Sequence, residues 1–214
     1  MHNISVAIDV DIVRDDTIDV LLDQLKRGKI YRVFLCGAGF LYSEKCKLID
    51  EPEKYKKMIQ LFKDEGFETG IWISSLGHGC MLPGTKLSED EKKFTNLRGV
   101  NGGVAEHGFC PSDENFRRVF CEKIKKLAEL GPDLIQLDDD YRLNYRGGIV
   151  CACFCDKHLK EYYERIGEEL PLEEISKYLL TGGKNKYRTA YMEMCRDTLL
   201  DFAKVLRSAV DEVN

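Results

Sequence analysis

Three consecutive carboxylates, Asp138, Asp139 and Asp140, follow the short apolar run LIQL in the second half of the chain. The run comes after a Gly-Pro turn signal and is typical of a buried strand in a parallel sheet. Because unpaired carboxylates are costly to bury, the chain should leave the core at Asp138. Crowding raises the pKa of one such group, and a carboxyl protonated near neutral pH is what general-acid catalysis requires. The pattern predicts the floor of a site at a strand end.

The same residues allow a purely structural interpretation. Side-chain alternation would place Asp138 and Asp140 on one face of a continuing strand and Asp139 on the other. Arg142 and Arg146 could keep all three carboxylates ionised, while the aspartates cap backbone N–H groups at a loop mouth. We favour a functional site, because position at a strand end adds to the evidence of the residue types.

A cysteine cluster follows the aspartates. Cys151, Cys153, Cys155 and His158 are spaced closely enough to reach one ion, and tetrahedral zinc commonly takes three cysteines and one histidine. Cys110, in the segment HGFCPSDENF after the third predicted strand, could complete the set, which leaves Cys151 as a spare or alternative ligand. The alternative is that cysteines pack as small apolar residues, which suits those on predicted strand and helix faces, Cys36, Cys121 and Cys195.

Two histidines are weaker candidates. His78 lies between glycines just beyond the third predicted strand, where it could approach a substrate closely, although an exposed loop histidine fits nearly as well. His107 is a similar but weaker candidate. Trp72 precedes His78 within the strand, and we expect it to fill the core.

Composition restricts the class of protein. The 214 residues are 43% hydrophobic and 32% charged, which is typical of a folded globular chain. A net charge of -5 gives no electrostatic basis for binding nucleic acid or an anionic membrane, and no apolar run approaches the roughly 20 residues of a membrane span. The N-terminal residues lack the pattern of a signal peptide, and nine cysteines, an odd number, favour a reducing compartment. We therefore expect a cytoplasmic protein.

Hydrophobic periodicity predicts alternating strands and helices. Strands are expected over residues 4–10, 31–36, 68–74 and 134–137, and helices over residues 17–27, 52–65, 114–127, 156–166, 172–180 and 187–213. Residues 75–112 are expected to form a long glycine-rich connection. Alternation implies an α/β fold with a parallel sheet, and four βα units fit half of a (β/α)8 TIM barrel, which needs about 250 residues when whole. An open doubly wound sheet is the alternative, although no glycine-rich phosphate loop follows the first strand.

The stretch QLDDDYRLNYRGGIVCACFCDKHLKEYY resembles the fourth-strand region of the family 42 β-galactosidases. In that family a strand ends in Asp-Asn-Glu-Tyr, and a loop with Cys-aromatic-Cys and a further Cys follows. Asp140 stands where that family has its acid/base Glu, and Asp139 where it has Asn. Cys153, Cys155 and His158 match the loop, and HGFCPSDENFR resembles the family's Cys-Pro segment, which places Cys110 at the fourth position.

The resemblance implies a single domain over residues 1–214 that forms the N-terminal half of a glycoside hydrolase barrel. It implies a structural zinc ion beside the active site and a carbohydrate substrate. Asp140 would be the acid/base, whereas Asp138, Asp139, Arg142 and His78 would bind sugar hydroxyls or tune Asp140. The family's nucleophile is a Glu on the seventh strand, and the chain ends where a long helix should lead into the fifth. Little or no hydrolase activity is therefore expected from a single chain.

Two other functions remain open at this stage. A half-barrel exposes two sheet edges, so it could be a non-catalytic carbohydrate-binding or scaffold protein that closes by dimerisation or by pairing with a missing C-terminal half. A metal-dependent hydrolase could instead use Asp138, Asp140 and His78 around a catalytic ion, although such enzymes usually contain more than the four histidines found here.

Overall fold

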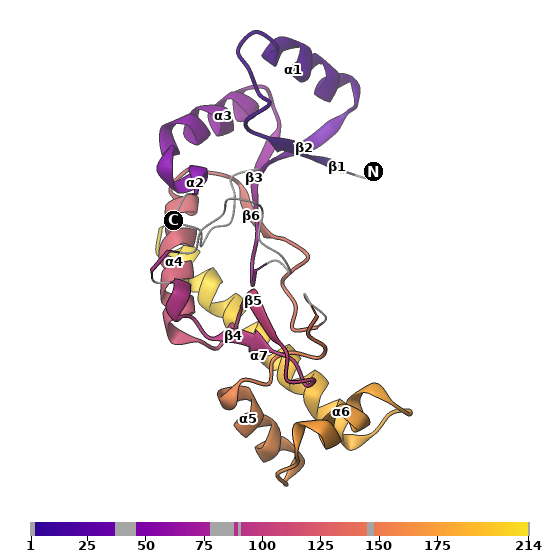
Figure 1. Cartoon of the computed structure of the whole chain (residues 1–214). Coiled ribbons are helices and arrows are strands. Elements are labelled where there is room, and N and C mark those ends of the chain that lie inside the picture. The colour runs from indigo at the N-terminus through magenta and orange to yellow at the C-terminus, as the bar shows by residue number, and fades with distance from the viewer. Residues whose placement is uncertain (1–2, 37–45, 78–87, 90, 145–147, 214) are drawn as a thin grey trace.

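The computed structural model describes residues 3–36, 46–77, 88–89, 91–144 and 148–213. Its centre is a parallel sheet of four strands in the order β1 (Ile4–Asp9), β2 (Ile30–Cys36), β3 (Glu68–Ile73) and β6 (Leu134–Leu137) (Figure 1). The helices are α1 (Ile18–Arg27), α2 (Lys47–Asp50), α3 (Pro52–Asp64), α4 (Glu114–Ala128), α5 (Asp156–Ile166), α6 (Leu172–Leu180) and α7 (Lys186–Asp211). The predicted α/β fold with a parallel sheet is confirmed.

One side of the sheet carries the main hydrophobic core. A single row of register partners crosses all four strands and consists of Ile8, Leu35, Ile71 and Ile135. These side chains pack with apolar residues of α1, α3, α4 and α7, because each of those helices presents an apolar stripe of 3.6-residue period. We call this the helix side of the sheet.

The opposite side, which we call the open side, is covered less completely. Its central row is Ala7, Phe34, Gly70 and Leu134, and the Phe34 ring lies over Gly70 so closely that a Cβ there would be 2.5 Å from it. Trp72 and its register partner Gln136 are exposed on this side, Trp72 by 39%. The expectation that Trp72 fills the core is wrong, since strand alternation turns its side chain away from the helices that bury Ile71 and Ile73.

The connection between β3 and α4 contains a hairpin that the sequence analysis did not predict. Strands β4 (Asn96–Arg98) and β5 (Val104–Phe109) pair antiparallel, and the 3-10 helix η1 (Glu91–Lys93) precedes them. The hairpin packs closely on the end of β3, where a Cβ on Gly77 would lie 1.9 Å from the His107 carbonyl oxygen. Only glycine fits there, and its φ of +104° is also one that glycine favours.

The C-terminal helices form a second, smaller core at the far end of the molecule from β1 (Figure 1). Helix α7 spans both cores, because Phe202 and Leu206 pack in the main core while Tyr191 and Met194 pack against α5 and α6. Among the described residues, no helix has the length and apolar character needed to cross a membrane.

Candidate metal centre and carboxylate site

The structure brings together Cys110, Cys153, Cys155 and His158, the four residues that the sequence predicts as metal ligands. All four are buried, and one possible ligand atom from each lies within 4.8 Å of the others. The Cys110 and Cys155 sulfurs are 3.8 Å apart, and His158 Nδ1 lies 3.4 Å from the former and 3.3 Å from the latter. This buried Cys3His cluster could hold a metal ion.

The three distances among Cys110, Cys155 and His158 fit the edges of a tetrahedral site. Zinc–sulfur bonds of about 2.3 Å in a tetrahedron give sulfur–sulfur edges of about 3.8 Å, and the shorter zinc–nitrogen bond gives slightly shorter sulfur–nitrogen edges. The distances between the Cys110 and Cys155 sulfurs and His158 Nδ1 have these values. The donor set of three thiols and one imidazole is also one that zinc prefers.

The surroundings of the cluster orient its members. His158 Nε2, which points away from the sulfurs, lies 3.2 Å from Ser112 Oγ and 3.1 Å from Thr198 Oγ1. Backbone N–H groups of Ser112 and Cys155 donate to the sulfurs of Cys110 and Cys153, each over 3.4 Å. A metal-bound histidine typically has its second ring nitrogen held in this way. Neither Ser112 nor Thr198 was identified from sequence, and Thr198 carries no local signal, because it lies 40 residues from His158 on α7.

Three separate segments deliver the ligands. The hairpin positions Cys110, whose N–H donates to the Thr95 carbonyl over 2.8 Å, and Asp113 then caps α4 by accepting from Phe116 N–H over 2.7 Å. The Phe154 N–H donates to the Arg98 carbonyl over 2.7 Å, which fastens the cysteine loop to the same hairpin. His158 lies in the first turn of α5. The cluster thus joins elements that are remote in sequence.

Electrostatics within the cluster favour a thiolate at Cys155. Hydrogen bonds from the Cys110 and Cys153 thiols hold the pKa of Cys155 far below its usual range, whereas the hydrogen bonds of Cys110 to Cys153 and Cys155 raise the pKa of Cys110. Burial lowers the pKa of the His158 imidazole, but its hydrogen bonds to Cys153 and Cys155 outweigh this and raise it to about 9. A metal ion bound here would displace these protons, since it takes thiolates and neutral imidazole.

Replacing Thr198 with valine is expected to lower the affinity of the cluster for a metal ion, with added Zn²⁺ as the probe, about 10- to 100-fold, because the substitution removes a hydrogen-bond partner of His158 Nε2 without changing side-chain shape. Competition with a chromogenic chelator measures this. Thr189→Val on the same helix is the matched control, since Thr189 is exposed and bonds only within its own helix. Equal affinities in the two variants would contradict the assigned role of Thr198.

The aspartates lie at the carboxyl end of β6, as predicted, but the strand ends at Leu137 and they form a turn. Asp138 Oδ1 accepts hydrogen bonds from Ser75 Oγ over 2.7 Å, Ser75 N–H over 3.1 Å and Asp140 N–H over 3.2 Å. Strand alternation therefore does not decide how the side chains point. Ser75, which the sequence analysis did not single out, holds Asp138 instead.

Asp140 is the most buried of the three carboxylates, with 5% of the residue exposed. Its Oδ1 lies 3.1 Å from a guanidinium nitrogen of Arg142, whose side chain is half exposed. Asp139 is exposed. Of the remaining candidates, His78 and Arg146 lie outside the described residues, and half-buried Cys151 is not part of the cluster of four.

The raised pKa that the sequence predicts within this group is found at Asp138. Burial raises the pKa of its carboxyl group, the Ser75 hydroxyl lowers it, and the nearby Asp140 carboxylate raises it again, with a net increase. The folded protein therefore binds this proton more tightly than the unfolded chain does. Stability from this group is present below its ordinary pKa of 3.8 and is lost as the pH rises through the folded value.

We expect Asp138→Asn to melt at a higher temperature than wild type at pH 7, because asparagine is never charged and still accepts from Ser75. The difference should shrink to nothing as the pH falls to about 3, where the wild-type carboxyl group is protonated. Thermal unfolding of both proteins at each pH measures the difference in melting temperature. Taking the difference removes the pH dependence of all other titratable groups, which the two proteins share. Asp139→Asn, at an exposed position, is the control. A variant less stable than wild type at pH 7 would contradict the assignment.

Two tyrosines tie the aspartate turn and the cysteine loop to α7. Tyr141 donates to the Leu199 carbonyl over 2.6 Å, and the Tyr191 hydroxyl lies 2.8 Å from the carbonyl oxygens of both Leu143 and Ala152. Phe154, between the two ligand cysteines, stacks on Tyr191 with ring centres 5.7 Å apart. The metal cluster and the carboxylates are therefore supported by one helix.

Comparisons with known proteins were informative only at the level of structure. No protein-family model matches the sequence, and no curated protein matches it either. The β-galactosidase of the psychrophilic Marinomonas ef1 superposes with a TM-score of 0.65 at 13% identity, over 99% of this chain and 35% of its own. The β-galactosidase of the Antarctic haloarchaeon Halorubrum lacusprofundi gives 0.65 at 14% identity, over the same shares of each chain. The catalytic domain of a β-amylase from Paenibacillus polymyxa gives 0.62 at 13% identity, over 99% of this chain and 63% of that domain.

The chain has a glycoside hydrolase-like fold. It spans about a third of the length of the two β-galactosidases and less than two thirds of the β-amylase domain. At these identities the likeness is one of fold alone, so the chemistry must be argued from the residues of this chain.

Proposed function

We propose that this chain is the N-terminal half of a glycoside hydrolase-like (β/α)8 barrel, a single domain over residues 1–214, in which Asp140 acts as the acid/base for hydrolysis of an O-glycosidic bond. The observation that carries the proposal is the position of Asp140, buried directly beyond β6 at the carboxyl end of a parallel sheet. Barrel enzymes build their active sites at that end. The likeness in fold to β-galactosidases supports the same interpretation.

In the complete barrel Asp140 would protonate the glycosidic oxygen as the bond breaks and then take a proton from the attacking water. Arg142, at 3.1 Å, would position its carboxyl group. Asp138, Asp139 and His78 would bind sugar hydroxyls, Asp138 from a position fixed by Ser75. The substrate class that follows is a carbohydrate.

We propose zinc as the ion of the Cys110, Cys153, Cys155 and His158 cluster, with a structural role. Four protein ligands leave no open position for a substrate, which is the arrangement of structural rather than catalytic zinc sites. When bound, the ion would fix the hairpin, the cysteine loop and α5 relative to one another. Tyr141 of the aspartate turn bonds to α7, and Tyr191 of α7 bonds to Leu143 and Ala152, so the ion would also stabilise the turn that carries Asp140.

A glycosidase needs two carboxylates that flank the scissile bond, and among the described residues we assign only one of them, Asp140. A monomer should therefore show little or no turnover of chromogenic galactosides and glucosides, and hydrolysis should require a second barrel half. Release of nitrophenol by the monomeric chain, abolished by Asp140→Asn, would contradict the half-barrel proposal.

A non-catalytic carbohydrate-binding half-barrel is the second candidate. The observation in its favour is that Asp140 carries one methylene fewer than the Glu of the family it resembles and is paired with Arg142. A misplacement of a catalytic group by about 1 Å can cost on the order of a hundredfold in rate. Sugar binding without hydrolysis by the assembled barrel would favour this candidate.

A further inference from the structure

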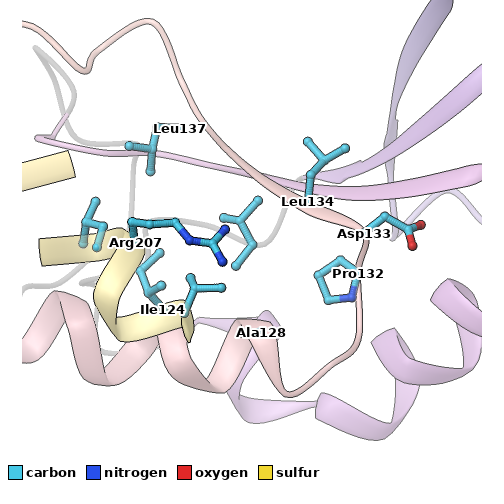
Figure 2. A pocket seen from close by; sticks show the side chains of 10 residues that line it. Ile124, Ala128, Pro132, Asp133, Leu134, Leu137 and Arg207 are labelled. Carbon is cyan, nitrogen blue, oxygen red and sulfur yellow. The ribbon is translucent and has the colours of Figure 1, made fainter. Parts of the chain in front are cut away.

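The outer edge of β6 borders a groove formed by two helices, lined mostly by apolar side chains together with the charged Asp133 and Arg207. Figure 2 shows Ile124 and Ala128 of α4 and Arg207 of α7 facing Leu134 and Leu137 of the strand. The groove encloses about 440 Å³. In the described part of the chain, β6 pairs only with β3, so its other side presents backbone N–H and C=O groups that no strand pairs. At this edge, α4 and α7 border a place beside β6 that no strand of the described residues occupies.

At the opposite edge of the same sheet, the strand is present but helices cover it incompletely. In the described residues, β1 pairs only with β2, and two of its apolar side chains lack full helix cover. Ile4 is 53% exposed, and Val6, which belongs to the helix side because its register partner is Val33, is only half-buried. Val20 on the adjacent helix α1 is 59% exposed. At this edge, two apolar side chains of β1 are only partly covered by helices.

Helices α7 and α1, one near each edge, also carry exposed apolar side chains. Leu200, two turns before Arg207 on the same face of α7, is 53% exposed, so α7 as well as α1 presents an apolar side chain to solvent. Both edges belong to one parallel sheet, so β1 of another molecule can add to β6 in the parallel direction and place its apolar side chains in the groove.

We infer that the partner of this half-barrel is a second copy of the same chain, with β1 of each copy docked on β6 of the other. The two contacts are related by a twofold axis and close a ring of eight parallel strands. Because all strands then run the same way, the two Asp138–Asp140 groups lie at one mouth, and the closed ring brings together a carboxylate group from each copy, as a reaction with two flanking carboxylates requires. This inference rests on the proposed function in that it takes the sheet to be half of a barrel.

Closure would also enclose the open side of the sheet. Its central row of Ala7, Phe34, Gly70 and Leu134 is small or apolar, as the interior of a closed barrel requires. Trp72, the only tryptophan, lies on this side and is 39% exposed. Dimer formation should therefore move its fluorescence emission to shorter wavelength, in step with concentration.

Light scattering after size exclusion tests the inference on the intact chain. We expect a mass of twice the 24.6 kDa of one chain, and a dissociation constant at least about tenfold weaker for Ile4→Lys and for Val210→Lys, since each would bury an unpaired charge. Leu180→Lys and Met192→Lys are the matched controls. They replace apolar residues that are 50% and 61% exposed, and Met192 lies 18 residues, or about 27 Å, along α7 from Val210.

Three outcomes would overturn the inference. They are a folded monomer at all concentrations, a dimer that persists unchanged in both edge variants, and a dimer weakened equally by the controls. The monomer would leave the edges to a different chain. Hydrolysis is a separate readout: a dimer that depends on Ile4 and Val210 but hydrolyses no glycoside would support the docking surface and contradict the catalytic role of Asp140.

Discussion

Cys153→Ser should abolish metal binding and lower the melting temperature by roughly 10 °C or more. Cys153 is completely buried, and a serine hydroxyl is a poor substitute for a thiolate ligand. For a structural zinc site the free energy of binding is also free energy of folding, and a loss of several kcal/mol shifts the melting temperature of a chain this long by about 2–4 °C per kcal/mol. The loss is large because the buried cluster joins three segments that are remote in sequence.

Elemental analysis and thermal unfolding on the same samples measure both effects. Cys151→Ser is the matched control, because Cys151 lies two residues earlier in the same loop but is not part of the cluster. It should keep one metal ion per chain and lose little stability. Metal retained by Cys153→Ser, or lost from Cys151→Ser, would show that the ligand set is wrong.

Asp140→Asn should reduce kcat/KM of the assembled barrel about 10²- to 10⁴-fold on nitrophenyl glycosides, the range expected when a general acid is removed. Asparagine preserves the shape of the side chain and can still accept from Arg142, so sugar binding should change little. Asp139→Asn is the control, since Asp139 is exposed in the same turn, and we expect it to cost less than about tenfold.

The leaving group distinguishes an acid from a merely structural residue. A dinitrophenolate leaves without protonation, so Asp140→Asn should be much less impaired on dinitrophenyl than on nitrophenyl glycosides. Equal impairment on both would mean that Asp140 supports the fold of the site instead of donating a proton.

Much of the fold follows from local patterns in the sequence. Helices α5 and α6 have the boundaries that periodicity predicts, and Asp113 caps α4 as expected. The four strands of the parallel sheet deviate from prediction by at most one residue at an end. These elements combine a clear apolar period with a capping or turn residue at the boundary, so local and tertiary preferences agree.

The β4–β5 hairpin shows where local patterns failed. Its strands are short, and the glycines around it suggested an irregular loop. The signal that could have revealed it is the Asn101-Gly102 pair between Leu97 and Val104, and Gly102 has a φ of +78° in the turn. Cys110 could be linked to the cysteine loop only by assuming that neighbouring strand ends meet.

The contacts that refine the site could not be predicted. Ser75 holds Asp138 across 63 residues, and Thr198 holds His158 across 40. Such pairs depend on how helices and loops pack, and a hydroxyl residue in isolation gives no sign of its partner. The exposure of Trp72 likewise depends on which side of the sheet the helices cover, which the residue type alone does not reveal.

X-ray absorption at the zinc edge, on protein purified without a histidine tag, tests most directly that Cys110, Cys153, Cys155 and His158 together hold one zinc ion. We expect one zinc per chain, with three sulfur neighbours at about 2.3 Å and one nitrogen at about 2.0–2.1 Å. A folded chain without zinc, or with a zinc shell made mainly of oxygen and nitrogen, would contradict the metal centre. It would also remove the feature that most specifically links the sequence to the β-galactosidases it resembles.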